Sequence, residues 1–483
     1  MNPKLYKFQL YGQLQRNLPK IYADARKAAD EIGIPAEIRG KFGLTGGVSG
    51  CPALLSKDVA DAVHSASRET IQLTSLVDKI REMVKSVYGD EYDAAPICTC
   101  EAGLWVSFDV LATPPMQGRG IPYRARYVVP YERHLHHHGS YGMPFPSKYK
   151  DIFADRGVTA GELGFYGKRL NNLDAVIVPL VGARYEAHGI KYHVVPLLSK
   201  VDPKASMERI SGEAEKQANT LSAFSSLGYD LPGYGYGAKD ARGTPQLQKM
   251  IGKLAQEYNV PYVCDNAGGL PFIGTDPREI NADIMLYSMD KSAGAPTSGL
   301  AIGKEDVMIN IRRALGMHGN RWGTTSSYAK AAYVVFDPGK EALVGQVVAL
   351  EKLRNEPEKV TKPRQALFKI VTEEFAALPN ELREGIIISE SHNSKSVEIN
   401  YENTWKEGKV GIPIFSIEDM YAGSNIIQRG LSEMGIVPCI AYDANILISG
   451  GLASDERGQL IEEKMRYGVK ALVKMIEIIL KYV

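Results

Sequence analysis

Two apolar stretches of the chain end in residues that could do acid–base chemistry. One stretch ends at Asp265, and the other, 284–287, ends at Ser288 and Lys291. Both are strand-like runs that stop abruptly at polar groups. The segment 268–283 between them is too long for a hairpin turn and long enough for a short crossover. We therefore expect neighbouring parallel strands that bring a carboxylate and an amine into one crevice, because open α/β sheets bind ligands at the carboxyl ends of their strands.

A carboxylate and an amine in one crevice are the pair that pyridoxal 5'-phosphate requires. An aspartate such as Asp265, paired with the pyridine nitrogen, keeps the ring protonated as an electron sink. A partly desolvated lysine such as Lys291 can form a Schiff base. Ser288, three residues earlier, is placed to bind the cofactor phosphate. Taken alone, an aspartate at a strand end and a lysine in a turn are also ordinary structural residues.

The segment around Lys291 resembles a known active-site motif. Residues 288–299 read Ser-Met-Asp-Lys-Ser-Ala-Gly-Ala-Pro-Thr-Ser-Gly, which is similar to the Schiff-base segment of fold-type-I pyridoxal phosphate enzymes. The resemblance is to the selenocysteine synthase-like group, which includes ammonia-lyases acting on amino-sugar acids. In that group a strand and a Gly-Lys turn follow, matched by Gly303-Lys304. The resemblance implies an α/β fold with a large, mostly parallel, seven-stranded sheet domain and a smaller C-terminal α/β domain.

A second segment is a candidate for binding the cofactor phosphate. Free N–H groups and the helix dipole make a helix N-terminus a phosphate site. The sequence Thr99-Cys100-Glu101-Ala102 follows a short strand and resembles the Gly-Thr-Glu-Ala turn of many fold-type-I enzymes, although the glycine is missing. The resemblance implies that Cys100, Glu101 and Ala102 bind the cofactor. Cys98 and Cys100 could also bind a metal, but no second pair with zinc spacing exists, so we expect packing and no metal.

Two loops supply the remaining candidates. Four histidines occur in 134–138, and the resemblance implies that one of them stacks on the pyridine ring. His134 is the candidate residue, and which of the four stacks stays open. A polar loop or a metal site are alternatives, but adjacent residues of an extended chain point to opposite faces, so at most two could meet one ion. Arg313, His318 and Arg321 are expected to bind a substrate carboxylate or phosphate. Solvated charge is the alternative.

The rest of the chain predicts the elements that position these residues. Residues 1–44 are expected to form an N-terminal helical arm, 45–337 the large cofactor-binding domain and 338–483 the small C-terminal domain. We expect one helical stretch over 57–87 and a closing helix from Asp455 onward. Candidate strands of the small domain are 385–388, 396–399, 414–417, 436–441 and 446–449.

Composition restricts the partners and the location. The 57 basic and 56 acidic residues give a net charge of +1, so nothing global steers the chain to nucleic acid or to a membrane surface. Five widely spread cysteines fit a reducing compartment better than a disulfide framework. The first residues lack the apolar core expected of a signal peptide, and the sequence has no run of about 18 apolar residues. We expect a cytoplasmic protein, and the resemblance implies a homodimer or higher homo-oligomer.

These observations lead to one leading function and two alternatives. The first is a lyase that catalyses elimination or β-replacement on an amino acid or amino-sugar acid through a Lys291 aldimine. The second is an aminoacyl-tRNA-dependent selenium or sulfur transferase, which the absence of a basic run argues against. The third is a non-catalytic protein that binds pyridoxal phosphate. Asn445 occupies a region where many amino-acid-binding relatives carry an arginine, which disfavours a conventional transaminase. The substrate, the leaving group and the choice among elimination, replacement and amino transfer stay open.

Overall fold

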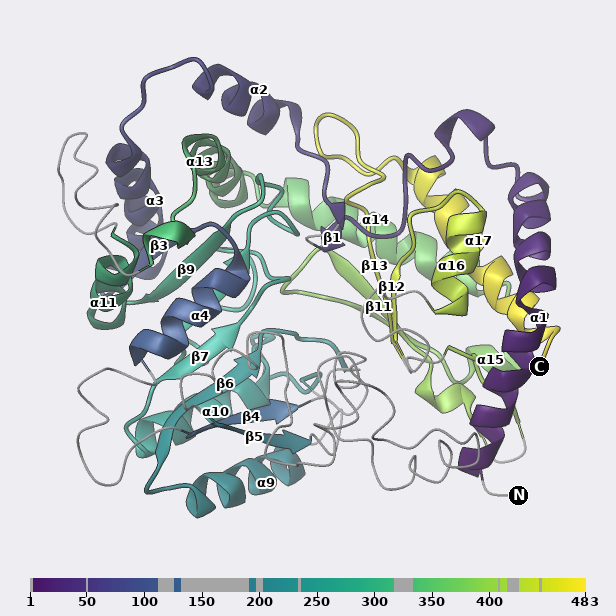
Figure 1. The fold of residues 1–483 in the computed structure, drawn as a ribbon, viewed down its shortest axis with the longest axis horizontal. Helices are drawn as coiled ribbons and strands as arrows, with labels where there is room; N and C mark the ends of the chain where they lie inside the picture. The colour runs from purple at the N-terminus through teal and green to yellow at the C-terminus, as the bar shows by residue number, and fades with distance from the viewer. Residues whose placement is uncertain are drawn as a thin grey trace.

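The computed structural model describes residues 3–48, 51–111, 126–131, 191–196, 203–232, 236–316, 333–406, 409–414, 425–442 and 445–483. Within these residues the buried apolar side chains form two separate cores. The larger core surrounds a seven-stranded sheet, and the smaller core lies around a four-stranded sheet. The two units lie side by side (Figure 1). Side chains from 10–44 join the smaller core, and the expected domain boundaries stay a prediction.

The larger sheet has the strand order β3-β9-β8-β7-β6-β4-β5. Its strands are β3 (Tyr92–Ile97), β9 (Gly299–Lys304), β8 (Ile284–Ser288), β7 (Tyr262–Asp265), β6 (Leu221–Leu227), β4 (Arg126–Tyr131) and β5 (Lys191–Pro196). Strands β8, β7, β6, β4 and β5 are parallel to one another, whereas β9 is antiparallel to both β3 and β8. The expected mostly parallel seven-stranded sheet is therefore confirmed.

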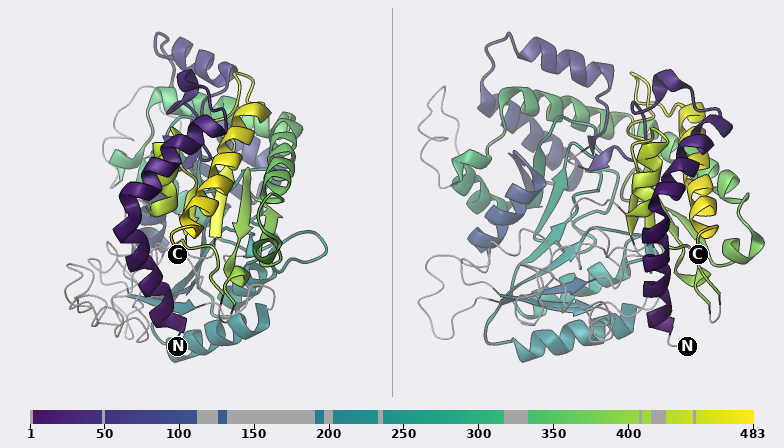
Figure 2. Two further views of the ribbon diagram at one scale, coloured as in Figure 1. Left: turned by 90° about the vertical axis from the view of Figure 1, so that its right-hand side faces the viewer. Right: turned by 45° about the vertical axis from the view of Figure 1, so that its right-hand side comes forward.

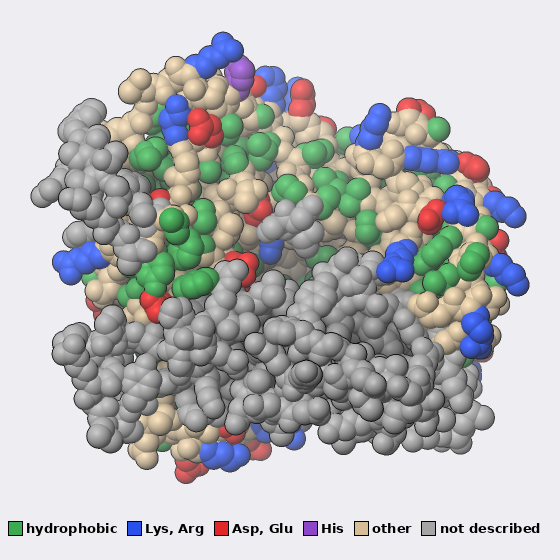
Figure 3. All heavy atoms as spheres, in the orientation of Figure 1, with side chains coloured by type: hydrophobic (Ala, Val, Ile, Leu, Met, Phe, Trp, Pro, Cys, Tyr) green, Lys and Arg blue, Asp and Glu red, His purple; other side chains and the backbone are tan. Residues whose placement is uncertain are grey.

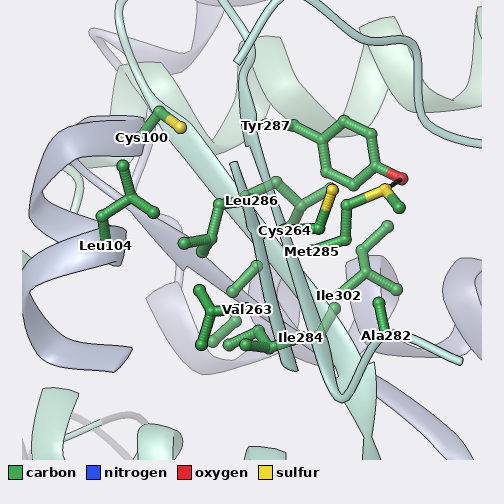
Figure 4. Packing of buried hydrophobic residues seen from close by; sticks show 14 of the residues in the cluster. Cys100, Leu104, Val263, Cys264, Ala282, Ile284, Met285, Leu286, Tyr287 and Ile302 are labelled. Atoms are coloured by element: carbon green, nitrogen blue, oxygen red, sulfur yellow. Dashed lines mark hydrogen bonds between the residues drawn. The ribbon is translucent and has the colours of Figure 1, made fainter. Parts of the chain in front are cut away.

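Helix α4 (Cys100–Leu111) covers one face of this sheet above β7, β8 and β9. Successive residues of a strand point to opposite faces, and Figure 4 shows Leu286 directed toward Leu104 of α4 while Tyr287 lies on the other side. The helix can approach closely because residue 103 is glycine. An added methyl group at Gly103 would lie 2.6 Å from Cδ1 of Ile97 and 2.9 Å from Cδ2 of Leu286.

Other helices surround the larger sheet. Helices α9 (Pro203–Lys216) and α10 (Gln246–Glu257) pack on strands β4 to β7, and α11 (Glu305–Leu315) packs on β3 and β9. Helices α2 (Lys57–Ala66), α3 (Leu73–Tyr88) and α13 (Lys340–Asn355) pack together beside β3. This arrangement leaves the carboxyl ends of β7 and β8 facing the smaller unit.

The smaller sheet is antiparallel, with the order β10-β11-β13-β12. Its strands are β10 (Ile387–Glu390), β11 (Ser396–Asn400), β13 (Asn445–Ser449) and β12 (Ile440–Tyr442). The helices of this unit are α1 (Pro3–Glu31), α14 (Glu358–Phe375), α15 (Asn380–Arg383), α16 (Ile426–Glu433) and α17 (Glu462–Leu480). Figure 2 shows α1 lying along α17, so the first and last helices pack against each other.

Two expected helices differ from the structure. The expected helical stretch over 57–87 is two helices, α2 and α3, because the chain turns between Ser67 and Gln72. The hydroxyl of Ser67 donates to the carbonyl of His64 (2.7 Å) and so competes with helix continuation. The closing helix starts at Glu462 and not at Asp455. The carboxylate of Asp455 instead accepts hydrogen bonds from the backbone of Arg457 (2.9 Å) and Gln459 (2.8 Å) and closes a turn.

Two expected strands of the small domain also differ. The expected strand 436–441 is reduced to β12, because Val437 pairs with the N-terminal arm. Its N–H donates to Phe42 (3.0 Å), and its carbonyl accepts from Leu44 (2.9 Å). Ile414 lies outside any strand, and 415–417 fall outside the described residues. No helix in the described part of the chain is long and apolar enough to cross a membrane.

Candidate active site

Asp265 and Lys291 occupy neighbouring positions at the ends of two parallel strands. Asp265 is the last residue of β7 and lies beside Leu286 of β8. Lys291 follows in the turn after β8, where its carbonyl accepts from Gly294 (3.3 Å). Burial raises the pKa of Asp265, and the positive charge of Lys291 opposes that rise. The carboxylate and the amine are therefore close enough for their charges to interact, and the crevice that they were expected to share stays a prediction.

One oxygen of Asp265 has a hydrogen-bond partner within the described residues and the other has none. Its Oδ1 accepts a hydrogen bond from the backbone of Ala267 (3.2 Å) and a weak one from the thiol of Cys100 (3.8 Å). Oδ2 has no hydrogen-bond partner among the described residues. Burial raises the pKa of Cys100 well above its ordinary value, and the charge of Asp265 raises it further. Cys100 is therefore a neutral thiol that packs against Asp265, and no metal-binding group of His, Cys, Asp or Glu occurs in the described ranges.

The N-terminus of α4 lies next to Asp265. The hydroxyl of Thr99 accepts from the backbone of Ala102 (3.0 Å) and so caps the helix. The N–H groups of Cys100 and Glu101 have no partner among the described residues, as expected at a helix start. Gly299 of β9 packs against this turn, where an added methyl group would lie 2.5 Å from the carbonyl carbon of Thr99. These amides can hold an anion, although one carboxylate oxygen of Glu101 is also buried there without a partner.

Ser288 has a different partner from the one expected. It is 4% exposed, and its hydroxyl donates to Oδ1 of Asp290 (2.8 Å). Oδ2 of Asp290 is buried without a partner in the described part of the chain. The hydrogen of Ser288 therefore points to Asp290, and a bond between Ser288 and a phosphate stays a prediction.

Of the expected ring-stacking and substrate-binding residues, the structure describes Arg313 alone. His134, His318 and Arg321 lie outside the described residues. Arg313 is exposed on α11. Its neighbour Arg312 is buried and ion-pairs with Asp93 inside the larger core. A role of Arg313 in substrate binding stays a prediction.

A polar network behind the site was not expected from the sequence. The side chains of Asn266 and Asn393 exchange two hydrogen bonds of 2.5 and 3.1 Å, and Asn393 also donates to the carbonyl of Gly228 (2.7 Å). Asp230 accepts from the hydroxyl of Ser391 (2.7 Å) and from the backbone of His392 (2.7 Å). The network fastens the turn between β10 and β11 to the larger sheet. No local signal marks these residues, apart from the position of Asn266 directly after Asp265.

Comparisons with known proteins give distant structural similarity only. No family model and no curated protein matches the chain. Among solved structures, D-glucosaminate-6-phosphate ammonia-lyase is 15% identical, with a TM-score of 0.46, 92% of this chain covered and 99% of that one. The complex of SepCysS with the SepCysE N-terminal domain is 13% identical, with a TM-score of 0.48 and 92% and 96% covered. Pyridoxamine-pyruvate aminotransferase from Mesorhizobium loti is 15% identical, with a TM-score of 0.48 and 93% and 98% covered. The structural neighbours are pyridoxal phosphate enzymes of fold type I, the group that the sequence resembles, and function is argued below from the site itself.

Proposed function

We propose that the protein is a pyridoxal phosphate-dependent enzyme that catalyses elimination or β-replacement on an amino acid or amino-sugar acid. The observation that carries this proposal is the charge interaction between Lys291 and the buried carboxylate of Asp265, whose Oδ2 has no hydrogen-bond partner among the described residues, at the carboxyl ends of two parallel strands. A buried carboxylate with a raised pKa gains from a cationic partner. The protonated pyridine nitrogen of the cofactor is such a partner.

Each residue of the site then has a definite task. Asp265 holds the ring nitrogen and its proton, and Cys100 and Ala267 fix the orientation of its carboxylate. The amides at the start of α4 hold the phosphate. Lys291 attaches the cofactor and carries the proton to and from the substrate Cα. The cofactor, when bound, supplies the electron sink that stabilises negative charge at Cα.

The uncharged residue Asn445 at the start of β13 favours elimination or replacement over amino transfer. Asn445 is fully buried, and its side-chain oxygen accepts from Asn400 of β11 (2.6 Å). It is engaged inside the smaller sheet and offers no cation to a substrate carboxylate. All five cysteines are free, which supports the proposal of a reducing, cytoplasmic location. We also propose a homodimer or higher homo-oligomer, on the resemblance alone.

The attachment of the cofactor to Lys291 is tested by borohydride reduction. Protein incubated with pyridoxal phosphate is reduced, digested and analysed by mass spectrometry. We expect a visible absorbance band before reduction and a cofactor-modified Lys291 peptide after it. Lys291→Ala should lose the modified peptide, whereas Lys253→Ala, an exposed lysine on α10, should keep it. No band at saturating cofactor, or modification of another lysine in the parent protein, would overturn the proposal.

The reaction type is tested by incubating the loaded protein with a panel of amino acids and amino-sugar acids. Release of ammonia with a keto acid supports elimination, and consumption of an added thiol or selenium donor supports replacement. Spectral change without turnover would instead identify a non-catalytic binding protein. Basic and acidic side chains are interspersed over the described surface seen in Figure 3, so we expect no salt-sensitive binding of bulk tRNA.

A further inference from the structure

A cavity lies beside Lys291 between the two units of the chain. It contains about 900 Å³ of empty space, part of which is open solvent. Its walls come from the turn 291–294, helices α13 and α14, the glycine segment 46–47 and the segment 449–460 after β13. Among the residues that the structure describes, no acidic side chain lines the cavity. Six basic side chains line it: Lys291, Lys352, Lys359, Arg364, Lys395 and Arg457. The cavity is therefore suited to an anion.

Three of these cations already have carboxylate partners. Lys352 pairs with Asp58 (3.2 Å), Arg364 pairs with Glu390 (2.6 Å), and Lys359 pairs with Glu356. The ammonium of Lys395 has no ion pair or hydrogen bond among the described residues. Burial lowers the pKa of Lys395 to about 8, and the charge of Lys352 lowers it further. Lys395 is thus a half-buried cation that lacks a counter-charge in the described part of the chain.

The hydroxyl of Ser449 is a second unsatisfied group in the wall. Ser449 is 9% exposed, and its Oγ is buried with no hydrogen-bond partner in the described part of the chain. Strands β11 and β13 pair Ser396 with Ser449, so Lys395 lies one residue from the partner of this hydroxyl. Gly47 leaves room near it, since an added methyl group at Gly47 would lie 3.5 Å from the Ser449 Oγ.

The position of Lys395 is fixed relative to Lys291. The backbone N–H of Lys395 donates to the hydroxyl of Ser292 (3.3 Å), which itself donates to the carbonyl of Gly268 (2.7 Å). Ser292 directly follows Lys291 in the turn. Because Asp230 fastens the backbone of His392 just before Lys395, the larger sheet holds both lysines. Lys291 and Lys395 therefore line the same cavity at positions that these bonds relate.

We propose that this cavity receives an oxyanion of the substrate, a carboxylate or a phosphate, held by the ammonium of Lys395 and the hydroxyl of Ser449. The inference rests on the proposed function and narrows its substrate class to amines that carry such a group within reach of Lys291. A charge-assisted hydrogen bond from the half-buried Lys395 and a second bond from the buried hydroxyl of Ser449 would satisfy both donors at once. Lys395 would also give the substrate oxyanion a cationic partner, which the uncharged side chain of Asn445 does not provide.

Calorimetric titration of the cofactor-loaded protein with inorganic phosphate and with malonate tests this site. We expect saturable binding of at least one anion to the parent protein. Lys395→Met keeps the length of the side chain and should weaken binding about tenfold or more, and Ser449→Ala should weaken it about three- to tenfold. Lys253→Met, which removes an exposed charge on α10, should bind as the parent does. Affinity should fall as the pH rises above about 8, where Lys395 loses its proton, and this fall should vanish in Lys395→Met.

Tighter binding of phosphate would assign a phosphorylated substrate, and tighter binding of malonate a carboxylate. Failure of both anions to bind the parent protein, or equal affinity in the parent and Lys395→Met, would overturn the inference. The borohydride assay separates the two proposals. Attachment at Lys291 without anion binding leaves the proposed function standing and removes only the oxyanion site. Lys395-dependent binding in a protein that never attaches the cofactor would remove the proposed function and keep the anion site.

Discussion

The hydroxyl of Ser288 donates a hydrogen bond of 2.8 Å to Oδ1 of Asp290, and both residues are almost fully buried. This is the only hydrogen bond of the Asp290 carboxylate within the described residues, since its Oδ2 has no partner. Ser288, the last residue of β8, thus donates to the carboxylate of Asp290, which lies in the turn that carries Lys291. The bond ties the end of β8 to the segment that carries the amine.

Ser288→Ala should destabilise the protein because it leaves the Asp290 carboxylate buried without any donor. We expect a loss of about 1–3 kcal/mol in the free energy of unfolding, measured in urea. Ser298→Ala is the matched control, since the buried hydroxyl of Ser298 donates to a neutral carbonyl, that of Pro296 (2.7 Å). The control should lose only about 0.5–1.5 kcal/mol. Equal losses in the two variants would show that Asp290 does not depend on Ser288.

Gly299→Ala should displace the start of α4. The added methyl group would lie 2.5 Å from the carbonyl carbon of Thr99 and 2.6 Å from the nitrogen of Cys100. We expect a loss of about 1–3 kcal/mol in stability together with weaker binding of pyridoxal phosphate, followed by visible absorbance. Gly212→Ala on α9 is the control, because nothing lies within 4 Å of its added methyl group. It should gain about 0.5–1 kcal/mol. Unchanged cofactor affinity in Gly299→Ala would argue against the α4 N-terminus as the phosphate site.

Asp230→Ala should loosen the attachment between the two units. Asp230 is 3% exposed and accepts hydrogen bonds from Ser391 (2.7 Å), His392 (2.7 Å) and the ammonium of Lys239 (3.0 Å). Removing a buried, paired carboxylate costs about 3–5 kcal/mol. Asp61→Ala, which removes an exposed carboxylate paired with Lys57, should change stability by less than about 1 kcal/mol. The free energy of unfolding of both variants is measured in urea. A small loss in Asp230→Ala would mean that other contacts hold the turn between β10 and β11.

Asp337 makes stability depend on pH. Burial raises its pKa to about 8, and both carboxylate oxygens are buried without partners in the described ranges. Between pH about 4, where an unfolded aspartate titrates, and about 8, the native state therefore binds more protons than the unfolded state. This contribution lowers stability as the pH rises through that window and is constant above it.

Asp337→Asn removes this proton linkage. Relative to the parent, the variant should become steadily more stable as the pH rises from about 4 to about 8, with no further change above. Thermal unfolding at pH 5, 7 and 9 measures the difference. Asp90→Asn, at an exposed position, should follow the parent curve. Parallel curves for Asp337→Asn and the parent would contradict the raised pKa.

The sequence by itself determined the local elements and the pair at their ends. Apolar runs that stop at polar residues marked β7 and β8, and the length of the segment between them indicated a parallel crossover. These patterns alone place Asp265 and Lys291 at one edge of the sheet. The sequence also predicts the turn before α4, because a strand end, a capping residue and a helix start are adjacent in the chain.

Only the tertiary structure decided which residues meet across long separations in the chain. Asn266 and Asn393 are 127 positions apart, and Asp230 and His392 are 162 apart, so no local period relates them. Helix rotation buries Arg312 and exposes Arg313, although the two are neighbours in sequence. The environment of Lys395 likewise arises only when α13, α14 and β13 close around it. Local preference acts over a few residues, whereas burial and charge at a site depend on every segment that packs there, and this is why the cavity could not be read from the sequence.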